Sequence, residues 1–276
     1  MINVLSGVLV RIAANSYLNV FQKKLTNSGS KPSVINFYTY LGLSILCVAL
    51  IPFYKISLSS ELLINFLIMG LLGALGNYFI IKALSIGELS SLAPINSYKP
   101  IVALIIAFFY LKEIPSIFAI LGIALIIFGT YILFEKGVGK YNSKAILYRV
   151  LALVFSGTEA VFIKKVILLT NIPTSFALWA VSGLIFSVFF VIYASYKFEL
   201  PSVKNLLLLI LSVALMQYST NYVFSKINVS YALALFQLST LLSVFLGVNI
   251  FNEGGLKRKL IASLVMIFGA VVIILG

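Results

Sequence analysis

The sequence alternates between long apolar stretches and short polar ones from end to end. The apolar stretches are broken at Pro, Gly and charged residues, and each has about the 20 residues that a helix needs to cross the hydrocarbon core of a bilayer. The pattern therefore predicts ten membrane-spanning helices joined by short loops. The predicted spans are residues 4–22, 34–54, 62–82, 89–110, 116–134, 147–165, 175–195, 204–223, 230–250 and 259–275.

Composition supports a membrane location. Of the 276 residues, 62% are hydrophobic and only 10% are charged, whereas a soluble domain carries about 25% charged residues. The net charge of +13 comes from Lys and Arg that stand singly or in small groups between the apolar stretches. That distribution is typical of topology signals and not of a nucleic-acid-binding surface. We expect a multi-pass protein of a cell membrane, with the lipid bilayer and not nucleic acid as a partner.

The two halves of the chain repeat each other. Several residue groups recur in the same order after 140 or 141 positions. The matched groups are Val20-Phe21 with Val161-Phe162, Lys23-Lys24 with Lys164-Lys165, Pro32 with Pro173, Gly42-Leu43 with Gly183-Leu184, Tyr78 with Tyr218, Glu113 with Glu253, and Ile127-Phe128-Gly129 with Ile267-Phe268-Gly269. Such a constant offset indicates a duplicated five-helix unit. We place the first copy at residues 1–138 and the second at 139–276, with a Lys- and Gly-rich linker at 135–144.

An odd number of helices per copy has a geometric consequence. The second copy must enter the membrane from the side opposite to the first, so the repeats are inverted about an axis in the membrane plane. Inverted repeats place a substrate site near the bilayer midplane, where either side opens as one half rocks against the other. The predicted fold is an all-α membrane protein, with ten transmembrane helices forming two inverted five-helix repeats around a central cavity.

Missing residue types exclude several kinds of chemistry. The chain has no His and no Asp, and Cys47 is its one cysteine. We therefore expect no metal site, no cofactor and no internal disulfide. The chain also lacks a Walker-type glycine loop, so we do not expect it to hydrolyse ATP. The first apolar stretch contains Arg11 and has no cleavage site of small residues, so we expect a retained helix and not a signal peptide.

A set of residues in the first half is similar to a known repeat. Ala83-Leu84, Pro100, Glu113, Gly122 and Gly129 resemble the EamA-type repeat of the drug/metabolite transporter superfamily. The second half keeps Glu253 and Gly269 but has Thr240 where the first has Pro100. The resemblance covers nearly the whole chain. It implies a transporter of small metabolites, often an exporter of amino acids or related compounds, whose relatives commonly use a proton gradient or exchange.

Ionisable residues inside the predicted spans are candidates for function, because charge is costly in lipid. Arg11 shares a helix face with Asn15 and Asn19, and it either lines a cavity or extends to the interface. Lys99 lies deep in the fourth span, one turn after Asn96. We favour a cavity role for Lys99, where it could bind an anion, over a static ion pair.

Two further residues of the spans suggest movement and coupling. Pro100 removes a backbone donor in the middle of the fourth span, which makes it a candidate hinge. Glu159 lies in the middle of the sixth span. It either carries a coupling proton or forms a structural ion pair with Lys99 or Arg11.

Matched polar pairs occupy the third and eighth spans. They are Asn77-Tyr78 and Gln217-Tyr218, joined by Asn221. We expect them to bind a solute from both halves, although helix-to-helix bonding is the commoner fate of amides in membranes. Trp179 either caps a cavity or, as we favour, anchors a helix at the membrane interface. Three basic groups at helix ends are expected to contact lipid headgroups: Lys23-Lys24, Lys164-Lys165 and Lys257-Arg258-Lys259.

Orientation stays open at the level of sequence. Most Lys and Arg lie beside the loops that follow odd-numbered spans. The positive-inside rule places those loops in the cytoplasm and both termini outside, whereas the family resemblance places both termini inside. An even number of spans puts the termini on one side in either case.

The leading hypothesis is a secondary transporter of small metabolites that works by alternating access, as a monomer or homodimer in a plasma or bacterial inner membrane. The first alternative is a non-transporting scaffold or sensor subunit. A membrane-embedded enzyme for lipid-linked substrates is a weaker one, since such chemistry usually needs His, Asp or metal.

Overall fold

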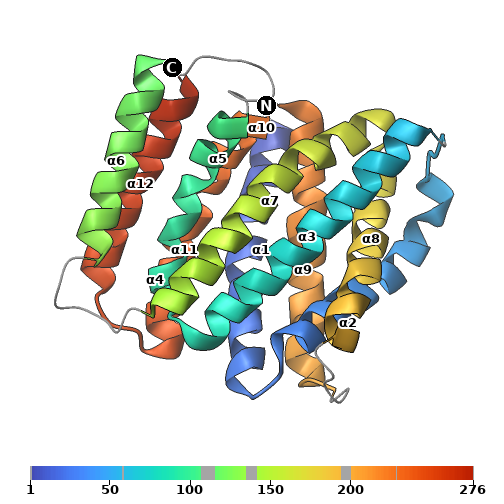
Figure 1. Ribbon diagram of the computed structural model, residues 1–276, viewed down its shortest axis with the longest axis horizontal. Coiled ribbons are helices and arrows are strands. Elements are labelled where there is room, and N and C mark those ends of the chain that lie inside the picture. The colour runs from blue at the N-terminus through green and yellow to red at the C-terminus, as the bar shows by residue number, and fades with distance from the viewer. Residues whose placement is uncertain are drawn as a thin grey trace.

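The computed structural model describes residues 2–57, 59–106, 116–134, 142–193, 200–227 and 229–275. Every regular element in this part of the chain is a helix (Figure 1). The elements are α1 (Ile2–Asn27), α2 (Pro32–Cys47), η1 (Val48–Phe53), α3 (Ser60–Ile86), α4 (Leu89–Leu92), η2 (Pro94–Tyr98), α5 (Lys99–Ile106), α6 (Ile117–Phe134), α7 (Ser143–Leu169), α8 (Ile172–Tyr193), α9 (Val203–Lys226), α10 (Val229–Phe236), α11 (Ser239–Phe251) and α12 (Leu256–Leu275).

Six helical segments in the described residues are long and apolar enough to cross a membrane: α1, α2 with η1, α3, α7, α8 and α9. The remaining four predicted spans coincide with α6, α12 and two interrupted segments. An all-helical, multi-pass membrane protein is thereby confirmed. The predicted boundary between the two copies lies outside the described residues.

The fourth predicted span, residues 89–110, is not the continuous helix that the apolar pattern suggested. It is divided into α4, η2 and α5, with Pro94 at the start of η2 and Pro100 in the first turn of α5. Proline cannot donate a backbone hydrogen bond and disfavours a helical residue before it. Residues beyond Ile106 in this span lie outside the described residues, as does Glu113.

The ninth predicted span is interrupted without a proline. A turn at Gln237 and Leu238 separates α10 from α11. The Gln237 side chain donates 2.9 Å to the Leu233 carbonyl, which the interruption would otherwise deprive of a helical partner. The corresponding segments of both copies are thus interrupted helices. Prolines accompany the interruption in the first copy, and a side-chain hydrogen bond from Gln237 accompanies it in the second.

Helices pack mainly against helices of the other copy. The helix pairs with the most extensive contacts are α3 with α7, α1 with α9, α2 with α8 and α6 with α12. Exchanging the copies turns the pairing of α3 with α7 into that of α9 with α1, and leaves the other two pairings unchanged. In Figure 1, α1 runs from the edge that holds both termini towards the opposite edge, and α7 runs the other way. The repeats are therefore inverted.

Two faces of the bundle are named from this arrangement. The terminal face holds both termini and the α7–α8 junction at Thr170–Asn171, and the opposite face holds the turns at Ser28–Lys31, Gly87–Glu88 and Asn252–Gly255 (Figure 1). That both termini share one face agrees with an even number of crossings.

Local capping fixes several helix ends. The Ser59 side chain accepts 3.1 Å from the Leu62 amide, and Asn252 ends α11 in the left-handed conformation at φ 54°.

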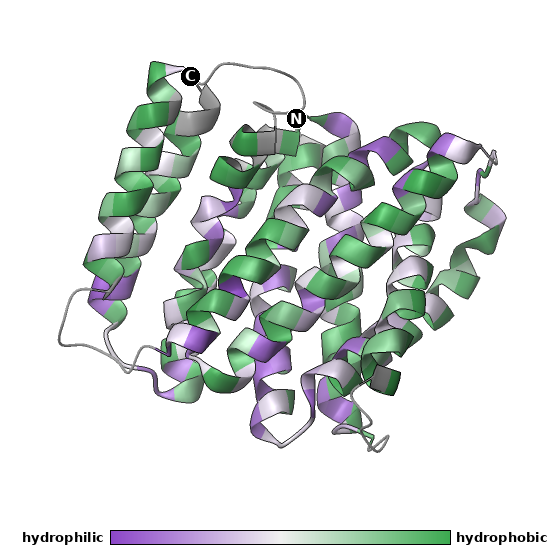
Figure 2. Ribbon diagram, in the orientation of Figure 1, coloured by the Kyte–Doolittle hydropathy of each residue, from purple (hydrophilic) through white to green (hydrophobic). Residues whose placement is uncertain are grey.

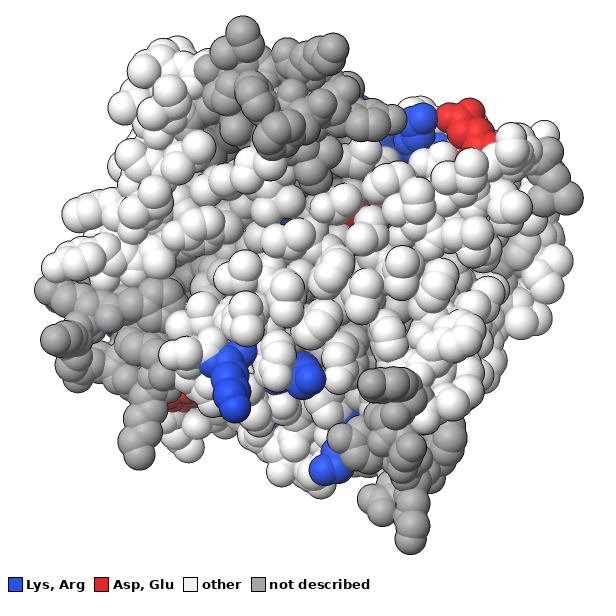
Figure 3. Space-filling model, viewed as in Figure 1, with Lys and Arg blue, Asp and Glu red and all other residues white. Residues whose placement is uncertain are grey.

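The exterior of the bundle is apolar. Leu168, Ile192 and Tyr131 are more than 60% exposed, as expected of side chains that face lipid. Hydrophilic positions gather at helix ends and again near the middle of the bundle (Figure 2). On the face shown in Figure 3, Lys and Arg lie near the lower edge, with one acidic and one basic group together at the upper edge. Charge inside the bundle is thus screened from lipid by apolar side chains.

Candidate functional site

A cavity of about 120 Å³ lies between the two copies, lined by residues from nearly every central helix. Its measured space exceeds what a single water needs several times over. The polar residues that line it are Arg11, Asn15, Asn19, Asn77, Asn96, Lys99, Arg149, Ser156, Glu159, Gln217 and Thr220. Seven of the ten predicted binding and coupling residues are brought together here: Arg11, Asn15, Asn77, Asn96, Lys99, Glu159 and Gln217.

The other three predicted binding residues lie outside this lining. Tyr78 packs its ring 5.3 Å from Phe190. Tyr218 is 39% exposed and borders an apolar groove on the outside of the bundle. Asn221 is fully buried behind the cavity wall, where its amide contacts Gln217 at 2.9 Å. One turn of helix has 3.6 residues, so Tyr78 and Tyr218 point about 100° away from Asn77 and Gln217.

Three cationic side chains reach the cavity from three helices. Arg11 on α1 and Arg149 on α7 are each only 6% exposed, and Lys99 extends from the first residue of α5. Arg149 stands near the start of the sixth predicted span, where a basic residue is expected at the membrane interface, but its burial contradicts an interfacial position. α7 begins at Ser143, which places Arg149 two turns inside the helix.

Arg11 has unused hydrogen-bonding capacity. Its Nε and Nη1 atoms are buried without any partner in the described structure, and its guanidinium lies 4.4 Å from the centre of the Phe236 ring. A buried Arg of this kind is costly unless something binds it. Arg149 uses one nitrogen, Nε, which donates 3.1 Å to the Leu92 carbonyl. Lys99 has no hydrogen bond or ion pair among the described residues.

One carboxylate faces these cations. Glu159 on α7 is 7% exposed and accepts a 2.5 Å hydrogen bond from the Trp179 indole. No ion pair within 4 Å joins it to a cation in the described part of the chain, so a direct pair with Lys99 or Arg11 is not formed. Trp179 is 5% exposed and lines the cavity. Its predicted role as an interface anchor is therefore wrong.

Gly73 makes room for the Glu159–Trp179 pair. A side chain added at Gly73 would place its Cβ 2.4 Å from Glu159 Oε1 and 3.0 Å from Trp179 Nε1. The neighbouring Gly70 is in tight contact with Ser182 in the same way. Gly70 and Gly73 of α3 thus allow close packing against the neighbouring helices, and Gly73 also shapes the cavity wall.

Amides form a chain along one side of the cavity. Gln22 donates 2.9 Å to Asn77, which in turn donates 2.6 Å to Asn36. Asn96 on η2 donates 3.2 Å to Gln237, at the interruption between α10 and α11. These bonds hold the amides in fixed orientations, so Asn77 and Asn96 present the cavity with polar groups that are already positioned.

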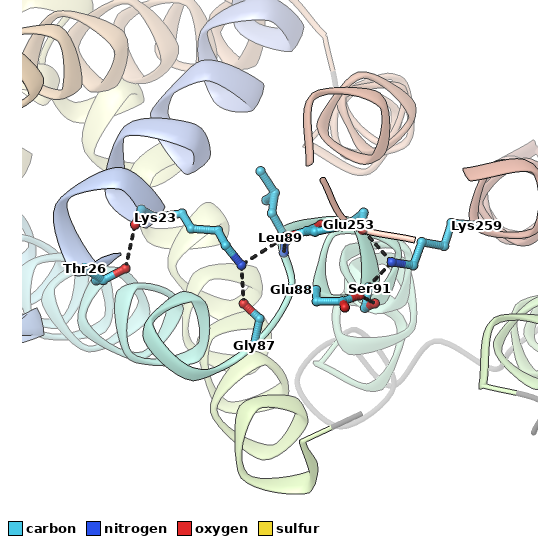
Figure 4. A network of polar contacts seen from close by, with 9 residues as sticks. Lys23, Thr26, Gly87, Glu88, Leu89, Ser91, Glu253 and Lys259 are labelled. Carbon is cyan, nitrogen blue, oxygen red and sulfur yellow. Dashed lines mark hydrogen bonds and ion pairs between the residues drawn. The ribbon is translucent and has the colours of Figure 1, made fainter. Parts of the chain in front are cut away.

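A buried network of hydrogen bonds and ion pairs connects several helix ends at the opposite face of the bundle (Figure 4). Lys23 at the end of α1 donates 2.6 Å to the Gly87 carbonyl and pairs at 3.0 Å with Glu253. Glu253 also accepts from the amides of Leu89 and Ser90, at 2.8 and 2.7 Å. The network therefore joins α1 to the α3–α4 and α11–α12 junctions.

A second ion pair extends this network. Lys259 contacts Glu88 at 2.7 Å and the Ser90 hydroxyl at 2.6 Å. Lys23 and Lys259 are only 8% and 1% exposed, so the prediction that these two contact lipid headgroups is wrong. Burial raises the pKa of Glu253, but the hydrogen bonds from Ser90 and the charge of Lys23 outweigh it and hold that pKa below its ordinary value.

The other copy repeats part of this arrangement. Lys164, the equivalent of Lys23, donates from α7 to the carbonyls of Phe224 and Ile227 at the end of α9. Ile227 stands 140 positions after Gly87, which is the repeat offset. Each copy thus has a lysine that binds the carbonyl end of its third helix.

The fold and the cavity define a class: a multi-pass helical membrane protein with inverted repeats around a polar, charged centre. The model of the EamA-like transporter family matches residues 5–135 and 143–275. The chain belongs to the EamA-like transporter family. It is therefore a membrane transporter of the drug/metabolite transporter type, built from two family repeats.

Solved structures agree with this fold. One chain, described only as the crystal structure of a protein, aligns over 97% of both chains with a TM-score of 0.67 and 15% sequence identity. At that identity the similarity shows the fold alone. Comparison with curated proteins gave no match.

Proposed function

We propose that this protein is a secondary transporter that moves a small metabolite, an amino acid or related compound, across a plasma or bacterial inner membrane by alternating access. Ten segments cross the membrane in this proposal, with the interrupted segments 89–106 and 229–251 as the fourth and ninth. The substrate binds in the central cavity. Export is the proposed direction, and the protein acts as a monomer or homodimer without a cofactor.

The observation that carries this proposal is the position of the cavity relative to the repeats. Arg11, Lys99, Arg149 and Glu159 gather where α1, α5 and α7 meet. Charge is costly inside a bilayer and usually marks a solute or ion pathway. A scaffold subunit would not need four ionisable groups around an open volume.

Alternating access is supported by the ion pair between Lys23 of the first copy and Glu253 of the second. Lys23 belongs to a network that fastens the opposite face, and Lys164 makes the corresponding backbone contact in the inverted copy. Rocking one copy against the other would break the Lys23–Glu253 pair, because it joins the two copies, whereas the Lys164 contact lies within the second copy and moves with it. Pro100, in the first turn of α5, lies at an interruption where bending costs few backbone hydrogen bonds, which supports the proposed hinge.

Glu159 is the proposed coupling residue. Among the described residues it is the one acidic residue that lines the cavity, and there it has a hydrogen bond to Trp179 but no ion pair. A carboxylate without a fixed cation can exchange a proton as its surroundings change between the two access states. Proton antiport through Glu159 would supply the energy for export.

The test is transport by the purified protein in proteoliposomes. A pooled set of labelled amino acids, organic acids and sugar phosphates would be offered with and without a pH gradient, and protein-free vesicles are the control. Uptake that saturates and depends on the protein supports the proposal. If no compound is taken up and none stabilises the protein against heat, the scaffold or sensor alternative replaces it.

A further inference from the structure

The charges around the cavity do not balance. Arg11, Lys99 and Arg149 provide three positive groups, and Glu159 is the one carboxylate among the lining residues. All four groups line the same cavity, so their charges act on one another across it. With Glu159 ionised, the site has an excess of two positive charges, and with Glu159 protonated the excess is three.

The described residues do not neutralise the excess charge. Arg11 has two buried nitrogens without a partner in the described structure, and its guanidinium lies over the face of the Phe236 ring. Arg149 bonds only to a neutral carbonyl. Other cations of this protein are treated differently: Lys23 and Lys259 are buried but paired with Glu253 and Glu88. The protein thus pairs its structural lysines and leaves its cavity cations unpaired.

Low polarity around the cavity strengthens these interactions. Phe224, Phe236, Leu233 and Ile163 form much of the remaining wall, so a bound anion is shielded from bulk water. Arg presents a planar group of donors suited to carboxylate or phosphate oxygens, and Lys adds a compact charge. Fixed amides of Asn77 and Asn96 can bind neutral polar atoms of the same solute.

From this arrangement we infer that the substrate is a small organic dianion, which has two carboxylates or one phosphate ester and is bound by Arg11, Lys99 and Arg149. The inference rests on the proposed transport function and narrows its substrate from amino acids and related compounds to those that carry two net negative charges. A dianion neutralises the excess charge when Glu159 is ionised. A zwitterion has no net charge and would leave the excess of two positive charges in place, and a cation would add to it.

The test uses the full-length protein in detergent and in proteoliposomes, with probes that differ in charge. Succinate and glutarate represent dicarboxylates, glycerol 3-phosphate represents phosphate esters, and lactate, alanine and choline represent a monoanion, a zwitterion and a cation. We expect at least one dianion to raise the melting temperature and to be taken up. Comparison of the dicarboxylates with the phosphate ester identifies the acidic group.

Variants locate the binding to the cavity. Lys99→Gln and Arg11→Gln are each expected to weaken binding of the effective dianion by at least about 20-fold, the scale for removal of one partner of a buried charge contact. Lys257→Gln is the matched control, because Lys257 is exposed on the opposite face, and it should bind as the unmodified protein does.

The possible results distinguish a failure of the inference on charge from a failure of the proposed transport function. If alanine or choline is taken up and no dianion binds, the protein is a transporter and the inference on charge is overturned. The same holds if a dianion is taken up with equal affinity by Lys99→Gln, Arg11→Gln and the control. If no probe binds and the wider pool of metabolites is not transported either, the proposed function itself fails.

Discussion

Asn96 and Gln237 stand at equivalent positions in the two copies, 141 residues apart, and hydrogen-bond to each other at 3.2 Å. Two residues related by a two-fold axis can touch only where they lie beside that axis. Their contact therefore locates the pseudo-symmetry axis of the repeats. It also joins the two interrupted segments, η2 before α5 and the turn between α10 and α11, at the wall of the cavity.

This contact predicts energetic coupling between the copies. Asn96→Ala and Gln237→Ala should each destabilise the protein, and the double variant should lose less than the sum of the two. The expected coupling is about 0.5–1.5 kcal/mol, the net contribution of one hydrogen bond. Thermal or chemical denaturation in detergent would measure it. Asn249→Ala is the control, because exposed Asn249 bonds only within its own helix, and additive losses at Asn96 and Gln237 would contradict the prediction.

A second prediction concerns the wall opposite the cations. Gly73→Ala should displace Glu159, because the added Cβ would lie 2.4 Å from Glu159 Oε1. The displaced atom ends a flexible side chain, so the protein should fold while transport slows by about tenfold or more. Gly76→Ala is the matched control one turn along α3, since its Cβ would meet nothing closer than 3.4 Å. Equal transport by the two variants would show that the Glu159 position is unimportant.

The helices of this protein were predictable in position but not in every detail. Apolar stretches of membrane-spanning length located the segments, because the lipid-facing side of each helix must be apolar along its whole length. Proline marked the interruption before Lys99. The interruption at Gln237 had no such mark, because it depends on an amide that bonds to the Leu233 carbonyl, and sequence pattern alone does not show that contact.

Sequence alone identified some, but not all, of the charged residues that lie inside the protein. Arg11, Lys99 and Glu159 stand out because charge inside an apolar stretch is costly. Arg149 was missed because it lies near the start of its apolar stretch, where a basic residue is usually interfacial, and only the true start of α7 at Ser143 places it inside. Lys23 and Lys259 look like interfacial residues too, but their burial follows from Glu253 and Glu88 on distant segments.

The proposed coupling role gives a third prediction. Glu159→Gln should abolish accumulation that is driven by a pH gradient but retain exchange of substrate for substrate, because glutamine keeps an oxygen that can accept the Trp179 hydrogen bond but has no proton to exchange. Proteoliposome uptake with an imposed gradient, compared with counterflow at equal pH, would separate the two activities. Loss of both activities would indicate a structural role, and retention of both would remove Glu159 from the coupling step.

A fourth prediction concerns pH and the network on the opposite face. The pKa of Glu253 is held below its ordinary value of 4.5, so the folded protein favours the ionised form. The stabilisation is fully present above about pH 4.5 and is lost as the pH falls through the lowered pKa of the folded state. Denaturation measured between pH 7 and pH 3 should show an acid-dependent loss of stability that is smaller in Glu253→Gln.

The same network predicts how the cavity opens. Glu253→Gln leaves Lys23 without its ion-pair partner and should cost about 1.5–3 kcal/mol, the range for a hydrogen bond to a charged group. If the network fastens the opposite face, this variant should expose the cavity on that side. A single cysteine at Ala152, which lines the cavity, in a Cys47→Ser background would report exposure through its rate of labelling by a membrane-impermeant reagent applied to that face. Labelling should be faster with Glu253→Gln and unchanged with Lys257→Gln, and equal rates in both would mean that the network stabilises the fold without controlling access.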